Sequence, residues 1–307
     1  MQPDALPELP AEKPAAMTRP FFWSVRRELW ENRSIYIAPL AVAALGLCGF
    51  LLSLARKLSP DTGLASFDPA YRPLQLAMPY THAAMLIAIT AFIVGTFYCL
   101  EALHSERRDR SILFWKSLPV SDRTTVLAKA SIPLVVLPVL VFTIVIALQW
   151  SMLLLSTAAL LLRGGSAAML WKQLPLVQLE VESLYSLIVM ALWHAPLYGW
   201  LLLVSGWARR TTFLWAVLPP LAIALVEFIT FGSTHFGSLL VQRLIGFATI
   251  AYNMKMPDGT AVDAHFIPVS QLAPGSFLST PGLWIGLVAA ALFIAAAVRL
   301  RRDREAL

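Results

Sequence analysis

The sequence predicts an all-α integral membrane protein with six transmembrane helices, and two observations support this fold class. The chain of 307 residues is 58% apolar and only 14% charged, with a mean hydropathy of +0.69. Six apolar runs are also long enough to cross a bilayer, which takes about 20 helical residues at about 1.5 Å of rise each. Because these runs are spread along the chain, we expect one membrane domain.

Two segments precede the first apolar run. Residues 1–17 carry four prolines and no periodicity, which is typical of a disordered tail. Residues 18–34 then place Phe22, Val25 and Leu29 at helical spacing. Charged side chains occupy the other faces of this helix, at Arg26, Arg27, Glu28 and Glu31. This pattern favours an amphipathic helix in the membrane interface, and the alternative is an ordinary juxtamembrane basic segment.

Six spans follow, and basic residues predict their orientation. The spans are predicted at residues 35–54, 80–100, 132–155, 184–204, 213–231 and 283–300. With this arrangement, 17 lysines and arginines flank one side of the membrane and seven flank the other. Because positive charge accumulates on the cytoplasmic side, both termini are predicted to be cytoplasmic. The membrane domain is therefore 35–300, with a cytoplasmic tail at 301–307 whose arginines act as a stop-transfer anchor.

The loop between the last two spans, residues 232–282, is the longest loop predicted outside the cytoplasm. Its first half, 236–252, is apolar but interrupted by Gly237, Arg243 and Gly246. These interruptions favour short helices that lie on or dip into the outer leaflet. The alternative is a seventh span, which would place the C-terminal arginines outside the cell.

The loop between the second and third spans is the most patterned polar segment of the chain. Residues 106–122 read ERRDRSILFWKSLPVSD, in which charges surround the apolar cluster 112–115. Pro119 would end a helix there, and Ser121 and Asp122 suit the N-cap and first turn of the next helix. A short helix with a charged end and an aromatic face is suited to docking in a groove of another protein. The alternative is an ordinary cytoplasmic loop.

This loop resembles the first cytoplasmic loop of ABC-2 type transporter permeases. The resemblance covers some 16 residues, and the matching positions are Glu106, Arg107, Asp109, Arg110, Ser111, Phe114, Trp115 and Leu118 to Ser121. In that family, a loop of this form supplies the coupling helix that docks on the ATPase subunit. One departure is that a glycine frequent after the acidic pair is replaced here by the Asp109-Arg110-Ser111 version.

The resemblance implies a membrane subunit of a bacterial exporter in the inner membrane, with no catalytic activity of its own. It also implies the interfacial N-terminal helix and the short re-entrant helices between the last two spans. Its partners would be a separate P-loop ATPase, a second permease subunit and the lipid bilayer, with no nucleic acid. ATP and Mg²⁺ would be bound by the ATPase, because this sequence contains no P-loop motif. The implied ATPase-coupling residues are Glu106, Arg107, Asp109, Arg110, Ser111, Phe114, Trp115 and Pro119.

Two polar residues within the spans are candidates for a substrate path. Glu227 lies near the outer end of the fifth span, and His194 lies in the fourth span, two residues before Pro196. Ionisable groups inside a membrane are costly, which makes them functional candidates. Each could instead form structural hydrogen bonds between helices.

Three other classes of function are alternatives to an exporter subunit. A secondary transporter would show an internal repeat with matched broken helices, and no convincing repeat is visible. An intramembrane enzyme would need a clustered acid, base or metal set, and no catalytic or metal-binding motif is visible. A scaffold or assembly subunit remains an alternative. The apolar spans would suit a hydrophobic or amphiphilic substrate.

Overall fold

The computed structural model describes residues 19–57, 72–109, 120–252 and 272–303. Within these residues all regular secondary structure is helical, and six helical segments are long and apolar enough to cross a membrane. The segments are α2 (Ser34–Lys57), α3 (Arg72–Glu101), the run of α6 (Asp122–Ser131), η2 (Ile132–Val136) and α7 (Leu137–Leu162), α9 (Leu176–Trp207), α10 (Thr212–Phe231) and α14 (Pro281–Asp303). The prediction of an all-α fold with six helices long and apolar enough to span a membrane is confirmed.

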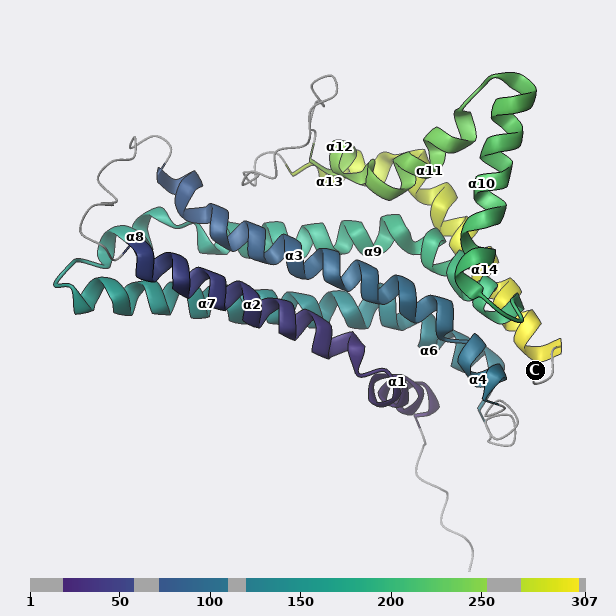
Figure 1. Cartoon of the computed structure of the whole chain (residues 1–307), viewed down its shortest axis with the longest axis horizontal. Helices are drawn as coiled ribbons and strands as arrows, with labels where there is room; N and C mark the ends of the chain where they lie inside the picture. The colour runs from purple at the N-terminus through teal and green to yellow at the C-terminus, as the bar shows by residue number, and fades with distance from the viewer. Residues whose placement is uncertain (1–18, 58–71, 110–119, 253–271, 304–307) are drawn as a thin grey trace, which may run out of the picture.

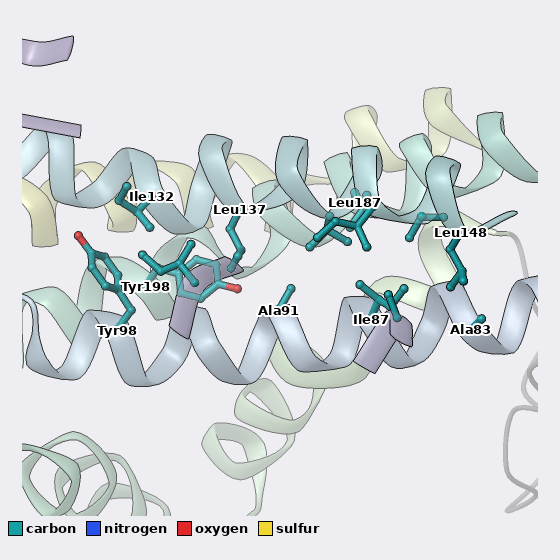
Figure 2. Close-up of a cluster of buried hydrophobic side chains, with 14 of the residues drawn as sticks. Ala83, Ile87, Ala91, Tyr98, Ile132, Leu137, Leu148, Leu187 and Tyr198 are labelled. Atoms are coloured by element: carbon teal, nitrogen blue, oxygen red, sulfur yellow. The ribbon is translucent and has the colours of Figure 1, made fainter. Parts of the chain in front are cut away.

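The main bundle consists of α2, α3, α7 and α9, which lie alongside one another in Figure 1. Ala83, Ile87 and Ala91 recur every four residues and therefore share one face of α3. Figure 2 shows this face opposite buried side chains of the neighbouring helices, including Leu148 and Leu187. The core of the bundle therefore lies between α3, α7 and α9.

The last span, α14, packs closely against α9 at Gly199. A Cβ atom at Gly199 would lie 3.1 Å from the carbonyl oxygen of Ala290, so the two backbones are nearly in contact there. Small residues permit this close approach of membrane helices. Gly286, four residues before Ala290 on α14, leaves room for the guanidinium group of Arg243.

The fifth span, α10, stands at an angle to the main bundle in Figure 1. Ala216 is its one buried residue, and its large apolar side chains are exposed. A helix that is apolar on all sides is typical of a segment in contact with lipid.

Six short helices complete the described structure. They are α1 (Pro20–Glu31), α4 (His104–Arg108), α8 (Ala168–Gln173), α11 (His235–Ile245), α12 (Phe247–Ala251) and α13 (Pro274–Ser279). The apolar residues 236–252 fall in α11 and α12, which have 11 and five residues and meet at Gly246. The alternative of a seventh span is therefore wrong, because neither helix is long enough to cross a bilayer.

Candidate functional site

The helices α1, α4 and α6 and the last turn of α14 come together at one end of the molecule (Figure 1). Charged side chains of these four helices form ion pairs there. We call this group the charge cluster. It contains three cations and three anions, which are Arg27, Lys129 and Arg301, and Glu28, Glu106 and Asp122. The charges of the six side chains are therefore balanced, although they come from four separate helices.

Lys129 of α6 is at the centre of the charge cluster. Its Nζ atom lies 2.8 Å from Glu28 Oε1 and 3.1 Å from Glu106 Oε1, so one ammonium group joins α1 to α4. The second carboxylate oxygen of Glu28 accepts a hydrogen bond of 2.8 Å from the Tyr98 hydroxyl of α3. Lys129 and Glu28 are 2% and 1% exposed, so these bonds are shielded from water.

The two arginines extend the charge cluster on either side of Glu106. The guanidinium group of Arg301 bonds Glu106 Oε2, and its Nε lies 3.0 Å from Asp122 Oδ1 at the start of α6. Arg27 Nη2 lies 2.7 Å from Glu28 Oε1 and 3.0 Å from Glu106 Oε1. Glu106 is thereby bonded to α1, α6 and α14 at once.

Because most of the charge cluster is buried, its effect on stability depends on whether every charge in it has a partner. Taking an ion out of water costs several kcal/mol, and a buried pair repays this only when all its members are bonded. Burial would by itself raise the pKa of Glu28, but the adjacent Lys129 and Arg27 outweigh that effect and hold its pKa below the ordinary value. Glu28 therefore stays ionised at neutral pH.

The local sequence explains why α6 begins where it does. The Ser121 hydroxyl accepts a hydrogen bond of 3.1 Å from the Thr124 amide, and Asp122 lies in the first turn. The predicted N-cap at Ser121 and Asp122 is confirmed. An acidic residue is favourable at a helix N-terminus. Asp122 therefore stabilises the start of α6 and also pairs with Arg301.

A second set of bonds fixes the loop to the end of α9. The guanidinium group of Arg107 donates to the Gly206 carbonyl at 2.6 Å. The Ser205 hydroxyl accepts from the backbone amides of Leu103 and His104, at 2.9 and 3.0 Å. The segment that leads into the loop is therefore held by α9 as well as by the charge cluster.

The structure places the predicted ATPase-coupling residues in three groups. Glu106 and Arg107 are 5% and 4% exposed and bond other helices of this chain. Asp109 is exposed and pairs with Arg108. The others lie outside the described residues, and these are Arg110, Ser111, Phe114, Trp115 and Pro119.

Glu227 caps a short helix. Its carboxylate accepts hydrogen bonds of 2.8 and 2.7 Å from the backbone amides of His235 and Phe236, in the first turn of α11. It also accepts a bond of 2.7 Å from the Ser233 hydroxyl. These contacts favour the structural role that was the alternative for Glu227, because they satisfy amides that a helix N-terminus leaves free.

His194 is buried between helices. Its Nδ1 lies 2.9 Å from the Met190 carbonyl oxygen and its Nε2 lies 3.1 Å from that of Leu244 in α11. The imidazole ring also packs against Phe92 and Phe247, with centroids 4.8 and 5.5 Å apart. These contacts tie α9 to α3 and to the α11–α12 segment.

Sequence reasoning missed most of the charge cluster. The sequence pattern predicts Arg27 and Glu28 on the polar faces of the amphipathic helix and Arg301 in a stop-transfer anchor. In the structure, Glu28 and Arg301 are buried, and Phe22, Trp23 and Trp30 form the outer face of α1 instead. The available signal was Lys129, a lone charge between Ala128 and Ala130 that leads directly into an apolar span.

No protein-family model, curated protein or solved structure matches this chain. In the described ranges, His, Cys, Asp and Glu side chains form no group of three that could hold a metal ion. The side chains of the charge cluster bond one another across four helices, so they can hold α1, α4, α6 and α14 in a fixed relation to one another.

Proposed function

We propose that this chain is the membrane permease subunit of an ABC-type exporter, with both termini in the cytoplasm of a bacterial cell. A separate P-loop ATPase would dock on loop 106–122, and a second permease subunit would complete the transporter. The substrate would be hydrophobic or amphiphilic, in keeping with the apolar spans. The resemblance of the loop to the ABC-2 coupling segment and the six spanning helices support this proposal.

One structural observation carries the mechanical part of the proposal. Glu106, at the start of the loop, is bonded to α1, α6 and α14 through three cations, of which Lys129 and Arg301 are buried. Arg107, the next residue, is bonded to the end of α9. A displacement of the loop would therefore be passed to several helices at once, which is what coupling to a moving partner requires.

Glu106 and Arg107 act in this proposal as anchors within the chain. The contact with the ATPase is assigned to the apolar cluster 112–115, chiefly Phe114 and Trp115. Aromatic side chains supply large contact areas at protein interfaces, so their removal should weaken docking strongly.

The test is co-purification with a P-loop ATPase encoded by a neighbouring gene. The wild-type chain should capture the ATPase. The double variant Phe114→Ala/Trp115→Ala should capture at least tenfold less ATPase than the wild type. The control is Trp171→Ala, which removes an exposed tryptophan from the opposite end of the bundle and should capture as wild type does. Equal capture by the double variant, in a protein that inserts and melts normally, would contradict the docking site.

A further inference from the structure

The bundle contains a cavity away from the charge cluster. It has a volume of about 220 Å³ and lies between α3, α7, α9 and α12. Most of its wall is apolar, with Met85 and Ala88 from α3 and Phe247 from α12. Its polar groups come from α3, α7, α9 and the residue after α12.

Gln149 of α7 is the unusual group in this wall. The side chain is 1% exposed, and neither its Nε2 nor its Oε1 atom has a hydrogen-bond partner among the described residues. Burying an amide without a partner costs free energy, and protein interiors rarely leave both ends unsatisfied. A buried donor and acceptor at the surface of a cavity therefore indicate a missing partner inside it.

The other polar groups of the wall indicate where in the cavity that partner lies. The Ser186 and Tyr252 hydroxyls form a hydrogen bond with each other, so each already has one partner within the wall. Glu182 lines the cavity from α9 and is 8% exposed. The bond of 2.8 Å from Trp150 Nε1 to Glu180 holds α7 and α9 in register here, which places Gln149 and Glu182 at a similar level of the bundle.

Water alone is a poor occupant of this space. The volume corresponds to about seven water molecules at roughly 30 Å³ each, and each buried water needs two to four polar partners. The polar side chains occupy only part of the wall, so water would face an apolar surface over the rest. A small ligand with an apolar body and one polar head would satisfy both parts of the wall.

We propose that this cavity binds a small neutral amphiphile whose polar head donates a hydrogen bond to Gln149 Oε1 and accepts one from Gln149 Nε2. A primary amide has this pattern, because its carbonyl oxygen and amino group are complementary to those of the glutamine. The alkyl body then lies against Met85, Ala88 and Phe247. This site is independent of the proposed ATPase docking, because it rests on α3, α7 and α9 and not on loop 106–122.

The experiment is photo-crosslinking of the full chain in lipid nanodiscs with a diazirine analogue of octanamide. Labelled residues are mapped by mass spectrometry. In the wild type we expect adducts on the cavity faces of α3, α7 and α9, and competition by unlabelled octanamide but not by nonane.

Three variants make the test specific. Gln149→Leu keeps the volume but removes the amide, and Ala88→Phe fills the apolar part; each should reduce labelling at least fivefold. Gln178→Leu removes a glutamine of α9 that does not line the cavity and should label as the wild type does. All variants are first checked for an unchanged melting temperature.

Two results would overturn the proposal. Absence of adducts in the cavity of the wild type would show that no such ligand enters. Equal labelling of Gln149→Leu and the wild type would show that the cavity accepts any alkyl chain, including a lipid tail, without recognising the polar head. Binding is read directly, so neither result depends on whether an ATPase docks on the chain.

Discussion

At the scale of single residues, Lys129 is the group on which the charge cluster depends most. It bonds two buried carboxylates, Glu28 and Glu106. Replacing it with methionine would leave an excess of negative charge in a buried site. Removing one member of a buried ion pair typically costs about 3–5 kcal/mol, so we expect Lys129→Met to lower the free energy of unfolding by that amount.

This loss can be measured by reversible unfolding in mixed detergent micelles. The matched control is Lys172→Met in α8, where the lysine is exposed and a change within about 0.5 kcal/mol is expected. A change for Lys129→Met as small as that of the control would show that the charge cluster contributes no stability.

Glu28 makes the charge cluster sensitive to acid. Its pKa is lower in the folded protein than the ordinary value of 4.5, because Lys129 and Arg27 outweigh the effect of burial. Folding therefore favours the ionised form, and this stabilisation is complete above pH 4.5 and is lost as the pH falls through the lowered pKa.

We accordingly expect the stability advantage of the wild type over Glu28→Gln to shrink on acidification. The measurement is the melting temperature of both proteins in detergent from about pH 7, where the stabilisation is complete, down to about pH 3, below the ordinary pKa of a glutamate. A difference that stays constant over this range would contradict the assignment of Glu28 as a buried, ionised carboxylate.

At the scale of helices, Glu227 fixes the start of α11. Its carboxylate accepts bonds from the amides of His235 and Phe236. Loss of a capping side chain costs about 0.5–2 kcal/mol, so Glu227→Ala should loosen α11. Hydrogen exchange of residues 235–245 should become two- to thirtyfold faster, while Glu180→Ala, which removes a carboxylate bonded to Trp150 instead, should leave this segment unchanged.

The contact between α9 and α14 depends on Gly199. A Cβ atom there would meet the Ala290 backbone at 3.1 to 3.3 Å, so Gly199→Ala must push the helices apart. Overpacking of this kind costs about 1–3 kcal/mol, and the melting temperature should fall.

Gly49→Ala is the matched helical control, since nothing lies within 4 Å of that position. It should be neutral or slightly stabilising, because alanine favours helix by up to about 1 kcal/mol. If Gly199→Ala and Gly49→Ala melted alike, the close contact at Gly199 would be contradicted.

The helices also show what the sequence could predict. Spans are set by the length and hydropathy of local runs, so their number and approximate positions were predictable. The cap at Ser121 was also predictable from local sequence, because its hydrogen bond joins Ser121 to Thr124, only three residues away. The orientation of α1 was not, because Glu28 turns inward only to meet Lys129, which lies 101 residues away in the chain.

At the scale of the whole molecule, the structure joins two ends of the chain beside one loop. Arg27 of α1 and Arg301 of α14 bond Glu106, the first residue of the loop, and Lys129 joins Glu28 of α1 to the same carboxylate. Composition and spacing cannot show such a meeting, because each charge alone is typical of a solvated segment flanking a span. The cavity beside Gln149 was likewise not predictable, since its walls come from separate helices.

The proposed function requires that an ATPase docks on loop 106–122. Site-specific cross-linking tests this most directly, with Lys116→Cys, which leaves Phe114 and Trp115 in place, compared with Trp171→Cys at the opposite end of the bundle. The background is Cys48→Ser, which removes the exposed native thiol, while the buried Cys99 stays unreactive. We expect an adduct between the ATPase and Lys116→Cys alone. An adduct at Trp171→Cys, or none at Lys116→Cys in a folded protein, would contradict docking on this loop.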